Sequence, residues 1–214
     1  YYEADDMAGA RRHINNALAI NSRSSEAYNV QALVHQREGD TELADAAFRR
    51  AISLDRSNSR ARNNYAAFLF NQQRFEDAYD ELQVVANDTS YEGRAVAFEN
   101  LGRSALRLGR MEDAERAFER ALQLNSNLYV SILELAQLRI NSGDFGSART
   151  LYNQYLTTRE FYGIPHTPRS LWIGIQVENH FQNQNLVEGY ARILTALYQE
   201  SPEYQLYQNL TNGN

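Results

Sequence analysis

A pattern of small, bulky and small residues recurs through this sequence at intervals of 34 to 36 residues. The clearest copy is Ala114, Phe118 and Ala121, whose spacings of four and three place them on one face of a helix. Four further copies stand in register: Ala10, Ile14 and Ala17; Ala44, Phe48 and Ala51; Ala78, Leu82 and Val85; and Ala148, Tyr152 and Tyr155. Small residues let helix axes approach to about 8–10 Å, and a bulky side chain fills the space between them. The pattern therefore predicts a regular stack of helices.

Each copy of the pattern is preceded by another amphipathic helix. The predicted unit is therefore a helical hairpin whose second helix carries the pattern. In the best copy, Phe98, Leu101, Ala105 and Leu108 share one face of the first helix, and Gly109 ends that helix. We expect each hairpin to bury its apolar face against its neighbours, as in an extended array of repeats.

The period divides the chain into six predicted hairpins and a final capping helix. The boundaries are about 1–22, 24–56, 58–88, 92–126, 128–158 and 169–200, followed by a short helix at 202–210, in a single array over residues 1–210. Met7 to Ile20 is the second helix of the first hairpin, so we expect that hairpin to be incomplete, with another helix before Tyr1.

Local signals predict how the hairpins are joined. Ser25 is predicted to be an N-cap, and a Gln-Gln-Arg turn at 72–74 replaces the usual glycine at a higher conformational cost. The stretch from Thr158 to Pro168 carries two prolines and is predicted to be a long loop or kink. In the last hairpin, we assign the small, bulky and small positions to Gly189, Ile193 and Ala196.

Composition excludes several classes of function. The 214 residues include no Cys, so no disulfide or thiolate site can form, and all 21 basic residues are Arg, so lysine-dependent phosphate loops and Schiff bases are excluded. The net charge of −6 argues against general nucleic-acid binding. The sequence contains no run of 18 apolar residues, so it predicts no membrane-spanning helix.

The residues show no arrangement typical of an enzyme. His13, His35, His166 and His180 are widely separated, and His35 occupies a helix-packing position, which favours a core or rim histidine. Acidic pairs such as Glu76-Asp77 lie in the first turn of second helices, where they complement the helix dipole. We therefore expect a non-enzymatic protein without metal or cofactor, and catalysis remains a remote third possibility.

The repeat resembles a known family. The hairpin period of about 34 residues, with Leu101-Gly102, Ala114, Phe118 and Ala121, is similar to the tetratricopeptide repeat, although Arg56 and Ser126 replace the usual proline at the repeat end. This resemblance implies an all-α solenoid, a right-handed α-superhelix of about six helical hairpins.

A more specific resemblance covers most of the chain. The segments NNYAAFLFNQQRFEDAY, VAFENLGRSALRLGRMEDAERAFERAL, RSLWIGIQ and SPEYQ resemble the type IV pilus biogenesis proteins of the PilF/PilW family. That resemblance implies an outer-membrane lipoprotein on the periplasmic face, which acts as a pilotin for the secretin subunit. The family's lipid-bearing Cys would then precede Tyr1, and membrane attachment would depend on that lipid alone.

The first helices of such an array line a concave groove, and residues not used for packing would point into it. A groove that mixes amide, arginine and apolar groups suits a peptide, because amides pair with its backbone while apolar groups form pockets. The predicted partner-binding residues are Asn29, Leu33, Arg37, Asn63, Phe70, Asn71, Arg103, Arg107 and Gln137. The competing interpretation is a merely solvated face.

Two functions remain open at this point. The first is a pilotin that binds the secretin subunit, and the second is a generic tetratricopeptide adaptor with another peptide partner. A clamp for a terminal carboxylate is disfavoured, because no cation stands at the matching positions, which are Asn29, Leu33, Asn64, Val96 and Asn100. We expect no nucleic acid and no small-molecule substrate as partner.

Overall fold

The computed structural model describes residues 7–212 and is helical throughout, without a strand in that part of the chain. The helices are α1 (Met7–Ile20), α2 (Ser25–Glu38), α3 (Thr41–Leu54), α4 (Ser59–Asn71), α5 (Phe75–Asn87), α6 (Arg94–Arg107), α7 (Met111–Leu124), α8 (Tyr129–Asn141), α9 (Phe145–Tyr162), α10 (Pro168–His180), α11 (Gln184–Leu197) and α12 (Pro202–Asn212). The chain divides into two compact units, residues 1–117 and 118–214. The predicted all-α class is confirmed.

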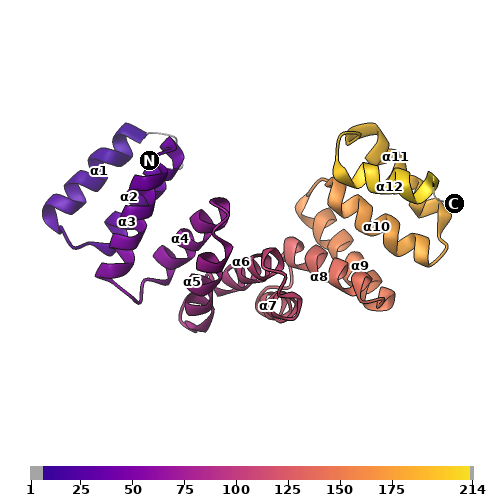
Figure 1. Ribbon diagram of the computed structural model, residues 1–214, viewed down its shortest axis with the longest axis horizontal. Helices are drawn as coiled ribbons and strands as arrows, with labels where there is room; N and C mark the ends of the chain where they lie inside the picture. Colours follow the sequence, from indigo (N-terminus) through magenta and orange to yellow (C-terminus); the bar gives the residue numbers. More distant parts are fainter. Residues whose placement is uncertain (1–6, 213–214) are drawn as a thin grey trace. The chain divides into compact units, whose positions relative to one another are not determined.

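The first unit contains α1 to α6 and the start of α7. Successive helices pack in pairs, with α2 against α3, α4 against α5, and α5 against α6 (Figure 1). The first helices of neighbouring hairpins also meet, since α2 contacts α4 and α4 contacts α6. This row of first helices is the structural element on which the candidate site is built.

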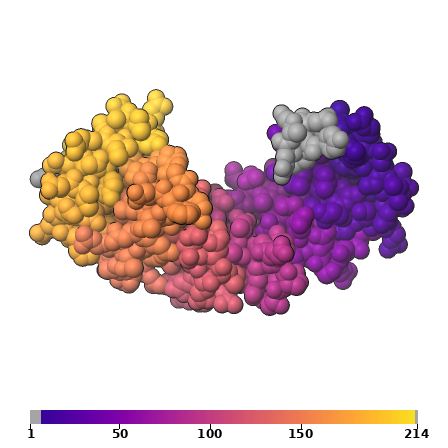
Figure 2. All heavy atoms as spheres, turned by 180° about the vertical axis from the view of Figure 1, so that it is seen from behind, coloured from indigo at the N-terminus to yellow at the C-terminus, as the bar shows by residue number. Residues whose placement is uncertain are grey.

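The second unit ends in three helices that close on one another. α12 packs against both α10 and α11, and α10 also contacts α8 and α9 (Figure 1). In the space-filling view, the atoms of α9 to α12, coloured orange to yellow, fill a continuous body (Figure 2). Gly174 on α10 faces the ring of Tyr152 so closely that a Cβ there would clash with the phenol, which explains the glycine in mid-helix.

The repeating stripe is the core of the structure. In the copies at 44–51, 78–85, 114–121 and 148–155, every bulky and small member is at most 1% exposed. In the first copy Ala10 and Ile14 are buried but Ala17 is exposed. The predicted packing register is therefore confirmed for the four later copies and for two of the three residues in the first copy.

Turns between paired helices use backbone conformations with positive φ. Glycine supplies them at Gly39, Gly109 and Gly143, while Gln73 (φ 61°) and Gln182 (φ 58°) occupy the same position in two hairpins. A residue other than glycine loses on the order of 1 kcal/mol of stability at positive φ. In the predicted Gln-Gln-Arg turn, Gln73 is the residue that adopts this conformation.

The predicted loop at 158–168 is wrong in its first half. Residues 158–162 contain neither Pro nor Gly, so α9 continues to Tyr162, and Gly163 then ends it at φ 65°. Thr167 caps α10 in a capping box with Ser170, and Pro168 is its first residue.

Two smaller assignments also need correction. Ser24, rather than Ser25, caps α2, because its hydroxyl accepts the Ala27 N–H at 3.2 Å while Ser25 is already helical. In α11 the buried stripe is Val187, Ala191 and Leu194, and not Gly189, Ile193 and Ala196. The helix begins at Gln184, so Val187, Ala191 and Leu194 are its fourth, eighth and eleventh residues. Their spacings of four and three place them on one face.

The central stripe can be tested at Phe118, whose side chain has no exposed surface. Phe118→Ala should lower the free energy of unfolding by about 3–5 kcal/mol, because it leaves a cavity as well as removing apolar contacts. Chemical denaturation measures the loss. Leu124→Ala on the same helix is the control, since Leu124 is 42% exposed. Equal small losses in both variants would show that Phe118 is not a core residue.

A second test concerns His166, which lies in the loop before α10. Burial lowers its pKa to about 4, with a smaller contribution from the Arg159 charge. The unfolded state therefore binds more protons between pH 6.5 and 4, so His166 should cost stability as pH falls through that window. Because the ring is only half-buried, we discount the effect to about 1–2 kcal/mol.

The measurement compares wild type with His166→Gln by thermal melting at pH 7 and pH 4.5. We expect the variant to lose less stability on acidification than the wild type. Identical acid losses would show that His166 does not contribute to the acid sensitivity.

Candidate binding groove

The row formed by α2, α4 and α6 carries eight of the nine predicted partner-binding residues. Arg37, Asn71, Arg103 and Arg107 are exposed, whereas Leu33, Asn63 and Phe70 are half-buried. Asn29 is only 1% exposed, and its Oδ1 accepts a hydrogen bond of 3.1 Å from Asn64. The expectation that Asn29 faces an open groove is therefore wrong, because its amide links α2 to α4.

Gln137, the ninth predicted residue, lies on α8 in the other unit. Its Nε2 donates to Asn141 at 3.0 Å, and its Oε1 accepts from Gln176 of α10 at 3.2 Å. Gln137 thus joins neighbouring first helices in the way that Asn29 does. The structure does not bring it together with the residues of α4 and α6 in one unit.

Three of the predicted residues line one pocket of 190 Å³ between α4 and α6. The residues that line it are Ala66, Ala67, Phe70, Asn71, Leu82, Asn100, Arg103 and Ser104. Alanine, phenylalanine and leucine form its apolar surface, while two amides and an arginine supply polar groups. This composition suits one apolar side chain of a partner that also offers hydrogen-bonding groups.

Phe70 organises the polar edge of this pocket. Its ring meets Phe75 edge-on with centroids 5.1 Å apart, and the guanidinium carbons of Arg103 and Arg107 lie 4.9 and 5.9 Å from its centroid. Arg107 also stands 4.1 Å from the Phe75 centroid. Such cation–π contacts contribute about 0.5–1 kcal/mol each at exposed sites, so they hold both cations over the rings.

Sequence reasoning missed Ala66, Leu82 and Ser104 as pocket residues. Leu82 belongs to the repeating stripe, so its role in packing concealed its position at the pocket. The Ser104 hydroxyl donates to the Asn100 carbonyl at 3.0 Å and is therefore occupied within α6. Spacing could have identified Ala66, which precedes Phe70 by four residues on the same helix.

Further cavities lie elsewhere in the described chain, and two of them are larger than this pocket. One of 390 Å³ lies between α1 and α2 and is lined mainly by apolar atoms, with Ala10, Ile14 and Val30 among its residues. The other, of 520 Å³, lies in the second unit beside α11 and Tyr207 of α12. Neither contains a predicted partner-binding residue.

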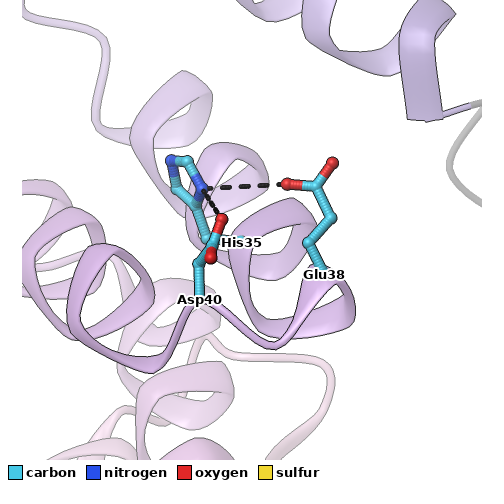
Figure 3. Close-up of side chains that lie close together, drawn as sticks. All are labelled: His35, Glu38 and Asp40. Atoms are coloured by element: carbon cyan, nitrogen blue, oxygen red, sulfur yellow. Dashed lines mark ion pairs between the residues drawn. The ribbon is translucent and has the colours of Figure 1, made fainter.

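Among the residues that the structure describes, one group of side chains has donor atoms close enough together to hold a metal ion. Ligand atoms of His35, Glu38 and Asp40 lie within 4.8 Å of one another, and His35 Nδ1 is 3.8 Å from Asp40 and 3.9 Å from Glu38 (Figure 3). However, the Arg11 guanidinium already pairs with Glu38 at 2.5 Å. Because a cation occupies one carboxylate, the cluster is better explained as an ion-pair network between α1 and the α2–α3 turn.

Stacked helical hairpins that repeat every 34 to 36 residues define a tetratricopeptide-repeat protein. Two sequence profiles described as Tetratricopeptide repeat match residues 29–92 and 95–128. Among solved structures, that of PilW, described as a widely conserved type IV pilus biogenesis factor, has a TM-score of 0.77 at 23% identity and covers 97% of this chain and 93% of that chain. This likeness confirms the fold.

The family follows from a closer relative. The chain is 34% identical over 208 residues to the type IV pilus assembly protein PilF of Pseudomonas aeruginosa, covering 97% of this chain and 81% of the relative. A structure of Pseudomonas aeruginosa PilF gives a TM-score of 0.90 at 34% identity and covers 97% of this chain and 91% of that chain. The protein belongs to the PilF family of tetratricopeptide-repeat proteins.

The ion-pair explanation of the His35 cluster predicts no response to metals. Thermal melts with zinc or calcium should show no change, because any ligand of the folded state must raise its stability by mass action. A saturable rise in melting temperature that His35→Gln abolishes would instead establish a metal site. Arg11→Gln should lower stability slightly in either case, since it leaves Glu38 without its cation.

Proposed function

We propose that this protein is a non-enzymatic scaffold of type IV pilus biogenesis, a pilotin that binds the outer-membrane secretin subunit and promotes its localisation and multimerisation. Membership of the PilF family supports the assignment to pilus biogenesis. The observation that carries a binding role is the pocket between α4 and α6, where apolar surface, two amides and the Arg103 cation converge. Arginine and aromatic residues are the types most enriched at binding hot spots.

Binding suits this surface better than catalysis. Among residues 7–212, the four histidines are spread over α1, α2, the loop before α10, and α10, so no two of them share a site. Asn100 and Ser104 line the pocket, but no histidine or carboxylate lines it to act as a general base. A tetratricopeptide groove of this kind recognises a protein segment through shape and hydrogen bonding.

The proposed location is the periplasmic face of the bacterial outer membrane. None of the helices between residues 7 and 212 is long and apolar enough to span a bilayer. Following the resemblance to the family, we propose attachment through a lipid on a residue that precedes Tyr1. Metabolic labelling of the full-length protein with a radioactive fatty acid tests this anchor, and absence of label would exclude it.

The binding role is tested by filling the pocket. Ala67 is exposed and lines the pocket, so Ala67→Arg should obstruct it without disturbing the core, and arginine is a good helix former. Affinity for the purified periplasmic part of the secretin should fall at least 30-fold, equivalent to about 2 kcal/mol. Secretin multimers in the outer membrane should fall in parallel.

Ala19→Arg provides the matched control, because Ala19 is an exposed alanine on α1 away from the pocket. It should bind the secretin as the wild type does. Full binding by a folded Ala67→Arg protein would place the secretin site on another surface. No binding by the wild type would contradict the pilotin function and favour an adaptor for another partner.

A further inference from the structure

We infer that the pocket between α4 and α6 accepts an apolar side chain from a protein segment that carries an aspartate or glutamate next to it, with Arg103 and Arg107 binding that carboxylate. The inference rests on the proposed binding function and specifies the chemistry of the partner. It concerns a side-chain carboxylate within an extended segment.

Arg103 and Arg107 differ from the arginines of this unit that pair with carboxylates, and they share with Arg50 and Arg94 a contact with an aromatic ring. The chain has 27 acidic residues against 21 arginines, so carboxylates are in excess. Arg11, Arg62, Arg74 and Arg110 all form ion pairs, with Glu38, Glu81, Asp77 and Glu76 respectively. Within residues 7–212, by contrast, Arg103 and Arg107 contact ring faces and form no ion pair with a carboxylate.

The ring contacts leave the hydrogen-bonding capacity of both guanidinium groups unused. A cation–π contact uses the flat face of the group, whereas its five N–H donors point outward in the plane. A carboxylate can therefore bind at the edge in a bidentate manner while the ring remains in place. Because Phe70 and Phe75 restrict the two side chains, less rotamer freedom is lost on binding.

The apolar and amide groups of the pocket determine which residues must lie next to the acidic residue in the bound segment. Ala67 and Phe70 offer accessible apolar surface in a cavity of 190 Å³, which is also lined by the buried Ala66 and Leu82. The cavity has room for a side chain and not for a helix. Asn71 and Asn100 present amides that can pair with a peptide N–H and C=O. An extended segment with adjacent apolar and acidic residues satisfies all three kinds of group.

Peptide display tests this chemistry without using the secretin. Random 12-residue peptides are selected on the wild-type protein and counter-selected on Ala67→Arg. Selected sequences should be enriched in an apolar residue next to Asp or Glu. A labelled peptide from that selection should lose at least tenfold in affinity when its acid is changed to the amide, and affinity should fall as salt rises.

Variants of the protein test whether Arg103 and Arg107 bind the acidic residue of the peptide. Arg103→Ala with Arg107→Ala should weaken peptide binding at least tenfold, whereas Arg12→Ala with Arg23→Ala, which removes the same two charges at exposed sites away from the pocket, should not. Arg103→Lys should give an intermediate loss, because lysine keeps the charge but not the planar fork. If the double variant does not fold, the amide change in the peptide and Arg103→Lys still decide the question.

Three results would overturn the inference: no selected peptide, selected peptides without acidic residues, or equal affinity for the acidic peptide and its amide form. A small anionic ligand is excluded if inorganic phosphate does not displace the peptide. Acidic peptides that bind while the secretin does not would leave the inference standing and contradict the proposed function. Secretin binding that is unaffected by Arg103→Ala would contradict the inference and leave the proposed function standing.

Discussion

The structure depends on burying one stripe of small and bulky residues in each second helix. Phe48, Leu82, Phe118 and Tyr152 are the bulky members and are at most 1% exposed. Burial of such a side chain contributes about 1.5–3 kcal/mol, and the small neighbours allow the close helix approach that makes this burial possible. Because the stripe uses the second helices for packing, the first helices supply the surface on which we propose that a partner binds.

That division explains which parts of the sequence were predictable. The period fixed the register of Ala44 to Ala51 and its later copies, since a core position has one physical requirement that every repeat must meet. The exact ends of helices were less predictable where two signals compete. The prolines at 165 and 168 suggested a long loop, yet no breaker precedes Gly163 and α9 continues to Tyr162.

The candidate site was predictable only in part, because groove positions have no shared requirement across repeats. The frame placed Phe70, Asn71 and Arg103 on the open face, and the structure brings them to one pocket. The same frame could not show that Asn29 turns inward to bond Asn64, or that Gln137 bonds Gln176. Amides at equivalent positions can either link neighbouring helices or face a partner, and only the side-chain geometry distinguishes the two.

The central proposal is that the secretin subunit binds the face between α4 and α6. The most direct measurement is photocrosslinking in living cells, with a photoreactive amino acid placed at position 67 or, for comparison, at position 19. The account predicts a crosslinked adduct with the secretin from position 67 and none from position 19. An adduct from position 19 alone, or a different protein captured at position 67, would contradict it.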